Sequence, residues 1–192
     1  MSFLFLDVES VPINKDDYLK RSEEERLKLL NPIDSKIIAV GVKVNKEKAL
    51  TFMDESEKVI LEGFWGRVKE FKKSHPAGKL VGFNVKSFDL PFLVTRSLVC
   101  NVRIIPFNLR DVVDLRELVS AYRFGATRGK LKEFAKFLGL DVIEGMDGGL
   151  VAIEYWNNNL DKIRVYLEKD LEITEALHKR IVELDIDKIA KW

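Results

Sequence analysis

Hydrophobic and β-branched residues gather in short runs along the chain, and these runs predict strands. We expect strands at residues 2–8, 36–44, 49–53, 80–83 and 111–114. Pro12 ends the first strand, because proline has no N–H to donate to a strand ladder. Polar residues 45–48 separate the second run from the third, so we expect these two strands to form a hairpin.

Longer segments repeat apolar residues at the 3.6-residue period of one helix face. We expect helices at residues 15–30, 57–73, 87–100, 115–122, 131–138 and 159–184. Asn31-Pro32 ends the first of these helices, since proline cannot continue one. Residues 145–149 are rich in glycine and form a loop.

The order of these elements predicts the fold class. This order indicates an α/β fold, because it runs from a strand and a hairpin through two helix-and-strand pairs to further helices. We expect one sheet with mixed strand directions and helices packed on both faces. The length fits a single domain over residues 1–192, in which the charged segment 14–34 is a surface insertion without catalytic residues.

Composition excludes several classes of protein. Hydrophobic residues make up 46% of the chain and charged residues 33%, whereas a disordered chain would be poorer in apolar residues. The apolar run 37–42 is far shorter than the ~20 residues that span a bilayer. The N-terminus lacks the basic region of a signal peptide. Cys100 has no second cysteine to pair with, and we therefore expect a cytoplasmic protein without membrane contact.

The charges of the chain are nearly balanced, with 32 Lys and Arg against 31 Asp and Glu, for a net charge of +1. A general binder of duplex nucleic acid would be basic overall, so the balance argues against that class. It still permits a small site that holds cations between its own carboxylates and a phosphate.

Two common kinds of catalytic site do not fit the sequence. Gly78-Lys79 lacks the flanking glycine and the Ser or Thr that a phosphate-binding loop requires. Neither His75 nor His178 lies beside a recognisable nucleophile, as a triad would need. We expect both histidines on the surface.

Carboxylates close the first predicted strand. Asp7 and Glu9 are two residues apart, and side chains at that spacing in a strand point to the same face. Two acidic residues after an apolar strand need either solvent or a cation. A strand that simply emerges into a polar loop therefore explains this pair as well as a metal site does.

Two later motifs also carry carboxylates. Asp89 lies in the first turn of a predicted helix, where it either caps the helix or faces the first pair across the strand ends. Tyr166 and Asp170 are four residues apart and share one face of the last helix. That face continues through core residues, and an aspartate directed inward is costly unless it is paired or coordinated.

The carboxylates of Asp7, Glu9, Asp89 and Asp170 are more specific together than apart. Four carboxylates from two strand ends and two helices can hold two divalent cations about 3.5–4 Å apart, and such a pair clamps a phosphodiester. Hard oxygen ligands suit Mg²⁺ or Mn²⁺ and not zinc.

The motifs resemble those of the DEDD superfamily of 3′–5′ exonucleases. The chain reads Asp7-x-Glu9, then Asn84-x-x-x-Phe88-Asp89, then Tyr166-x-x-x-Asp170. The tyrosine marks the DEDDy branch, which includes the proofreading domains of family-B DNA polymerases and similar stand-alone exonucleases. The histidine branch would have a histidine where this chain has Val165. The resemblance implies a ribonuclease H-like fold.

The resemblance also implies a role for each matching residue. The ligands of two Mg²⁺ or Mn²⁺ ions would be Asp7, Glu9, Asp89 and Asp170. Tyr166 would orient the attacking water and contact the substrate. The terminal nucleotide would lie against Val8, Ser10, Asn84 and Phe88. The family often has threonine where this chain has Ser10, so the hydroxyl is kept and the methyl group is lost.

The implied activity is hydrolysis of the last phosphodiester at the 3′ end of single-stranded or frayed nucleic acid. DNA is favoured over RNA, with a polymerase or repair partner in trans. The candidate phosphate contacts, which are otherwise ordinary solvated cations, are Lys86, Arg123, Arg128, Lys130 and Lys132. Two alternatives on the same fold stay open: a non-catalytic nucleic-acid-binding module, and a ribonuclease or endonuclease.

Overall fold

A mixed five-stranded sheet forms the centre of the computed structural model, which describes residues 1–122 and 129–189. The strands are β1 (Phe3–Pro12), β2 (Ser35–Val44), β3 (Leu50–Met53), β4 (Lys79–Gly82) and β5 (Val112–Asp114). Their order across the sheet is β3-β2-β1-β4-β5. The β1-β2 and β2-β3 pairs are antiparallel, whereas β1-β4 and β4-β5 are parallel. The predicted α/β class with a mixed sheet is confirmed.

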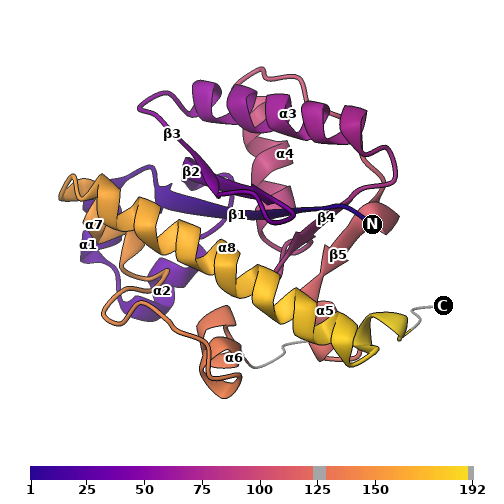
Figure 1. Cartoon of the computed structure of the whole chain (residues 1–192). Helices are drawn as coiled ribbons and strands as arrows, with labels where there is room; N and C mark the ends of the chain where they lie inside the picture. The colour runs from indigo at the N-terminus through magenta and orange to yellow at the C-terminus, as the bar shows by residue number, and fades with distance from the viewer. Residues whose placement is uncertain (123–128, 190–192) are drawn as a thin grey trace.

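Helices cover both faces of this sheet (Figure 1). They are α1 (Lys15–Lys20), α2 (Glu23–Lys28), α3 (Glu57–Ser74), α4 (Asp89–Val99), α5 (Leu115–Val119), α6 (Leu131–Phe137), α7 (Val151–Trp156) and α8 (Leu160–Glu183). Short 3₁₀ turns lie at Leu109–Asp111 and Ile186–Lys188. The helices α3 and α4 pack on one face, and the long helix α8 crosses the other.

The residues of β1 alternate between the two faces, as the pleat of a strand requires. Leu6 and Val8 are buried on the face covered by α3 and α4, where they join Phe64. Phe5 is buried on the opposite face, together with Leu171 of α8. The same alternation places the side chains that follow Phe5 at every second position on the α8 side of the sheet.

The first strand is longer than the sequence predicts. Asp7 and Glu9 do not end it, because β1 continues to pair with β2 as far as Pro12, past a bulge between Glu9 and Ser10. The prediction was wrong since it relied on the low strand propensity of acidic residues, which the long apolar partner strand overrides. The parallel pairing of β1 with β4, however, stops at Phe5. Both carboxylates therefore lie beyond the carboxyl end of β4.

Close packing of α8 on the sheet depends on Gly41 of β2, which pairs with Asp7. A Cβ atom at Gly41 would lie 2.9 Å from side-chain carbons of both Leu167 and Leu171. We expect Gly41→Val to destabilise the fold by about 1–3 kcal/mol, because the added methyl groups overpack this contact. Thermal or urea unfolding would measure the change.

The matched control is Gly66→Ala on α3, where an added Cβ meets no atom within 4 Å. Alanine has a higher helix propensity than glycine by about 1 kcal/mol, so this variant should unfold at or above the wild-type temperature. Equal stability of Gly41→Val and the wild type would contradict the close contact between α8 and β2.

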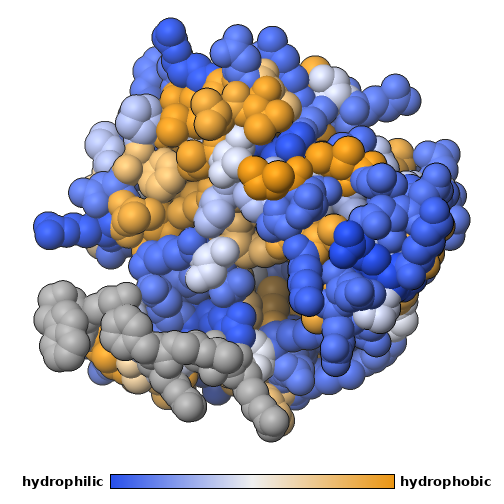
Figure 2. Space-filling view, turned by 180° about the vertical axis from the view of Figure 1, so that it is seen from behind, coloured by the Kyte–Doolittle hydropathy of each residue, from blue (hydrophilic) through white to orange (hydrophobic). Residues whose placement is uncertain are grey.

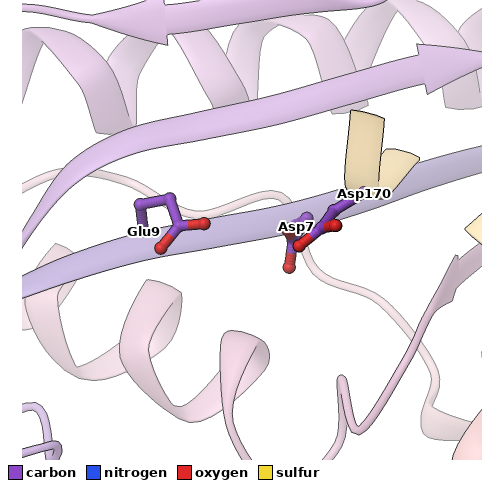
Figure 3. A group of neighbouring side chains, drawn as sticks. All are labelled: Asp7, Glu9 and Asp170. Atoms are coloured by element: carbon purple, nitrogen blue, oxygen red, sulfur yellow. The ribbon is translucent and has the colours of Figure 1, made fainter. Parts of the chain in front are cut away.

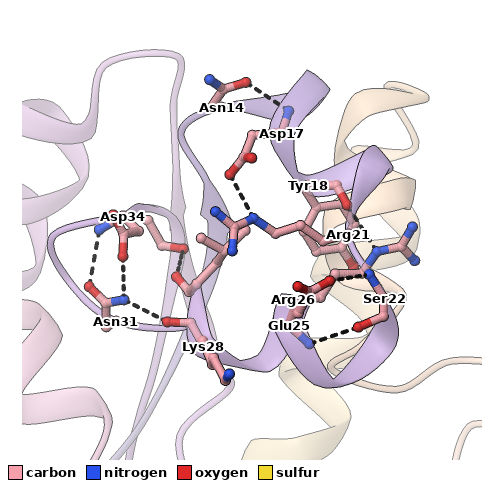
Figure 4. A network of polar contacts seen from close by, with 12 residues as sticks. Asn14, Asp17, Tyr18, Arg21, Ser22, Glu25, Arg26, Lys28, Asn31 and Asp34 are labelled. Carbon is pink, nitrogen blue, oxygen red and sulfur yellow. Dashed lines mark hydrogen bonds and ion pairs between the residues drawn. The ribbon is translucent and has the colours of Figure 1, made fainter.

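Residues 14–34 form two short helices and not the single helix predicted at residues 15–30 (Figure 4). The helical conformation is interrupted before Ser22, which is the N-cap of α2. The Ser22 hydroxyl accepts a hydrogen bond from the Glu25 N–H, and the Glu25 carboxylate accepts one from the Ser22 N–H. This capping box is visible in the sequence as Ser-x-x-Glu, and the prediction overlooked it. Tyr18 of this segment is buried against Trp156 of α7, with ring centroids 5.1 Å apart.

Two further differences from the predictions concern the second half of the chain. The helix α7 was not expected, because six residues form too few turns to show a helical period. His178 was expected on the surface but is only 7% exposed. Its ring packs between Phe3 and Phe5, with centroids 4.4 and 5.5 Å away, and burial lowers the pKa of its imidazole. Histidine here serves as an aromatic core residue.

The rear face of the molecule carries much of the exposed hydrophobic surface (Figure 2). The large apolar residues exposed on and after α4 include Val94, Leu98, Val99 and Leu109. Among residues 1–122 and 129–189, no helix combines the length and the apolar composition that a membrane crossing requires.

Candidate metal centre

Three carboxylates from opposite ends of the sequence meet on the α8 face of the sheet (Figure 3). Asp7 and Glu9 project from β1, and Asp170 projects from α8. Each offers a carboxylate oxygen, and the three oxygens all lie within 4.8 Å of one another. The structure thus brings together three of the four predicted metal ligands.

The fourth predicted ligand, Asp89, lies just outside this group and next to Asp7. It is the first residue of α4 and only 3% exposed. The interpretation of Asp89 as a helix cap is wrong, because the N-cap is Phe88 and no side chain caps the helix. The Oδ1 atom of Asp89 is buried and has no hydrogen-bond partner in the parts of the chain that the structure describes. Such an atom needs a cation or a proton.

Burial makes these acids harder to ionise than free carboxyl groups, and repulsion between neighbouring carboxylates adds to the effect at Asp7 and Glu9. Burial first, and then the charges of the neighbouring carboxylates, raise the pKa of Asp7 and of Glu9 well above their usual values. Burial raises the pKa of Asp89 to about 7, against hydrogen bonds from the backbone that lower it. Burial likewise raises the pKa of Asp170 to about 6, although Tyr166 and Lys132 act in the opposite direction.

This arrangement fits divalent cations. Asp7, Glu9 and Asp170 lie together with the buried Asp89 beside them, and no described residue forms a hydrogen bond with Asp89 Oδ1. Asp7, Glu9, Asp89 and Asp170 would hold such a cation as ionised carboxylates, because its charge would favour loss of their protons. The donors are all oxygen atoms, which is the ligand set that Mg²⁺ and Mn²⁺ prefer.

Tyr166 lies one helical turn before Asp170 on α8, as the spacing predicts. Its hydroxyl lies close enough to the Asp170 carboxylate to lower the pKa of that acid. Burial, followed by the charges of Asp170, Glu9 and Asp7, raises the pKa of the Tyr166 hydroxyl far above its usual value. The phenol therefore keeps its proton and acts as a hydrogen-bond donor beside the carboxylates.

The residues predicted to contact the nucleotide differ in how deeply their side chains are buried. The side chain of Val8 is 4% exposed and belongs to the core on the far face of the sheet, so only its backbone can touch a ligand. Ser10 is also buried. Phe88 is half-buried and packs on Phe92, with ring centroids 4.8 Å apart. Asn84 adopts a left-handed backbone conformation, with φ of 64°.

Two of the candidate phosphate contacts, Lys86 and Lys132, have protein partners. Lys86 forms an ion pair with Glu117 at 2.6 Å. Lys132 donates hydrogen bonds to the carbonyl oxygens of Ile143, at 2.6 Å, and Met146, at 3.2 Å. Lys130 is exposed at the start of α6. The remaining two, Arg123 and Arg128, lie outside the described residues.

One acidic residue near the cluster was not among the predicted site residues. Asp114 ends β5 and is 3% exposed, and its charge contributes to raising the pKa of Asp89. In sequence it looks like an ordinary residue between a strand and a helix. Only the folded chain shows which backbone groups its carboxylate reaches.

The chain matches one known protein family over most of its length. The family model of the RNase H superfamily matches residues 28–182. The chain belongs to the RNase H superfamily. The matched segment includes Asp89 and Asp170, and it begins after Asp7 and Glu9. No match to a curated protein was found by sequence.

The fold of this RNase H superfamily member is similar to a region of a much larger enzyme. That enzyme is the family B DNA polymerase from the hyperthermophilic archaeon Pyrobaculum calidifontis. The present chain matches it with a TM-score of 0.71 and 21% sequence identity. The similarity covers 97% of this chain and 25% of the polymerase chain. The chain thus spans about a quarter of that polymerase's length, and the predicted ribonuclease H-like fold is confirmed.

Proposed function

We propose that this protein is a metal-dependent 3′–5′ exonuclease of the DEDDy type. The observation that carries the proposal is the cluster of Asp7, Glu9 and Asp170, with Asp89 beside it and Tyr166 one helical turn before Asp170. Membership of the RNase H superfamily supports a nuclease on this fold. The tyrosine one turn before the last carboxylate distinguishes the proposed type from other nucleases of the superfamily.

The four carboxylates hold two Mg²⁺ or Mn²⁺ ions in this proposal. When bound, these ions supply Lewis-acid activation of the attacking water and stabilisation of the leaving oxygen. The protein's part is to fix the ligands. Asp7 and Glu9 are set by the pairing of β1 with β2, and Asp170 is set by the packing of α8.

Tyr166 orients the attacking water by donating a hydrogen bond from its hydroxyl. It does not act as a base, because its surroundings keep the phenol protonated. The terminal nucleotide lies against Phe88, Asn84, Ser10 and the backbone of Val8. Splaying that nucleotide away from its neighbours requires a single-stranded or frayed end, and stacking on an aromatic ring is worth about 1–3 kcal/mol per base.

The substrate in this proposal is DNA in preference to RNA, because the fold is similar to that of a DNA polymerase region. A polymerase or a repair protein acts as its partner in trans. The setting is the reducing cytoplasm, which suits a chain whose one cysteine has no second cysteine to pair with.

A substrate panel tests this function. It contains linear single-stranded DNA with a free 3′ hydroxyl, the same strand with a blocked 3′ end, a circular single strand and the matched RNA. We expect Mn²⁺ or Mg²⁺ to support release of nucleoside monophosphates from the free 3′ end and to leave the circle intact. Cleavage of the circle would show an endonuclease, and binding without turnover would show a non-catalytic module.

Replacing Tyr166 with phenylalanine should lower turnover by about 10- to 100-fold, because a misplaced attacking water is costly while the metal ligands stay. Mn²⁺ affinity, measured by isothermal titration calorimetry, should stay near that of the wild type. The control is Tyr155→Phe, because the Tyr155 hydroxyl accepts a hydrogen bond from Lys36 Nζ at 3.2 Å, away from the carboxylates of the cluster. Full activity of Tyr166→Phe would remove the tyrosine from the mechanism.

A further inference from the structure

The buried carboxylate of Asp114 binds backbone groups of a segment that leads into the metal centre. Its Oδ1 accepts hydrogen bonds from the N–H groups of Asn84, at 2.9 Å, and Arg116, at 3.0 Å. Its Oδ2 accepts one from the N–H of Lys86, at 3.0 Å. A carboxylate with several N–H donors is a strong and directional acceptor, and it fixes the position of the groups that donate to it.

The segment held in this way is the loop of residues 84–88, which forms most of the connection between β4 and α4. It begins with Asn84 in a left-handed conformation and ends directly before Asp89. A second contact ties the same loop to α5, since Lys86 Nζ lies 2.6 Å from a carboxylate oxygen of Glu117. Both contacts come from the segment that begins with β5, on the side of the loop away from β1.

Capping of α5 explains only part of this arrangement. The bond from Arg116 to Asp114 Oδ1 is an ordinary N-cap bond two residues along the chain. Oδ2 makes no such bond and accepts from Lys86, which lies 28 residues earlier in the sequence. The carboxylate therefore has one oxygen that bridges helix and loop and one that serves the loop.

We propose that Asp114 is a positioning residue of the metal centre, which fixes the loop of residues 84–88 and, through it, the orientation of Asp89. This inference rests on the proposed function, because it takes Asp89 as a metal ligand. Ligands that are themselves held by hydrogen bonds keep their geometry without the metal, and loss of such an outer partner typically weakens metal affinity or activity about 10- to 100-fold.

Two replacements of Asp114 separate geometry from charge. Asp114→Asn keeps an oxygen for Asn84 and Arg116 but presents an amide group to the Lys86 N–H, whereas Asp114→Ala removes all three bonds. Both remove one negative charge, so the difference between them reports the hydrogen bonds alone. We expect Mn²⁺ affinity, measured by calorimetry or electron paramagnetic resonance, to fall about 10- to 100-fold in Asp114→Ala and clearly less in Asp114→Asn.

The control is Glu57→Gln, which alters a half-buried carboxylate at the first residue of α3. Glu57 accepts from the Ile37 N–H at 2.7 Å and pairs with Arg96 at 2.6 Å. It should lose stability yet bind Mn²⁺ like the wild type. Equal affinities of Asp114→Ala, Asp114→Asn and the wild type would overturn the positioning role, as would an equal loss in Glu57→Gln.

The readouts also separate this inference from the proposed function. Wild-type protein that binds Mn²⁺ but cleaves no nucleic acid would overturn the exonuclease, while the binding series still decides the role of Asp114. Wild-type protein that binds no Mn²⁺ would overturn both. If Asp114→Ala does not fold, unchanged Mn²⁺ affinity in folded Asp114→Asn overturns the inference, and a several-fold loss supports it.

Discussion

Asp170→Ala should abolish Mn²⁺-dependent cleavage of single-stranded DNA, with a loss of more than about 100-fold, beyond the effect of losing an outer partner of a ligand. The reason is that Asp170 supplies the α8 oxygen of a group whose members all lie within 4.8 Å. Asp7→Ala should have the same effect, because Asp7 faces both Asp89 and Asp170. The measurement is initial rate against Mn²⁺ concentration, so that weaker metal binding is separated from slower turnover.

Glu172→Ala provides the control on the same helix. Glu172 is exposed and pairs with Lys169 at 3.3 Å, so its loss leaves the cluster unchanged. We expect its rate to equal that of the wild type. Substantial activity in both Asp7→Ala and Asp170→Ala would show that cleavage takes place elsewhere on the protein.

Without metal, Asp89→Asn should be more stable than the wild type at pH 8, by up to about 4 kcal/mol. Burial raises the pKa of Asp89 from 3.8 to about 7, so the folded protein holds this proton more tightly than the unfolded chain. Ionising the group in the fold is then costly, and the neutral amide avoids that cost. Urea unfolding in a chelator at several pH values measures the difference.

The pH dependence of this difference has a definite sign. Below about pH 4 both states are protonated, and the advantage of Asp89→Asn should vanish. It should grow as pH rises from about 4 to about 7 and stay constant above. Mn²⁺ at 100 times its dissociation constant should stabilise the wild type by about 2.7 kcal/mol and the variant less. A wild type that is the more stable of the two at pH 8 without metal would contradict the buried, metal-free cluster.

Spacing in the sequence was enough to pair carboxylates that share a face, while their joint assignment to one site came from the family resemblance. Side chains two apart in a strand and four apart in a helix share a face whatever surrounds them, so Asp7 with Glu9 and Tyr166 with Asp170 could be paired. The mixed sheet could also be predicted, because the element order limits the topologies available. These inferences depend on local geometry and on element order alone.

Properties set by tertiary contacts could not be predicted in this way. The burial of His178 depends on Phe3 and Phe5, which lie at the other end of the sequence. The carboxylate of Asp89 does not cap its helix, and its interaction with Asp7 joins segments far apart in the sequence. The bonds of Asp114 connect segments 28 and 30 residues apart, and no spacing rule reports them.

The placement of Asp7 on the first strand and Asp170 on the last long helix has a consequence for biosynthesis. A ribosome makes every strand of the sheet before it makes α8. Domains generally fold as units as the chain emerges, and contacts between distant segments form late. The nascent chain therefore displays β1 carboxylates that lack their partner until α8 has been made. In the proposed nuclease, this site is therefore incomplete on the ribosome, close to the nucleic acid of the translation machinery.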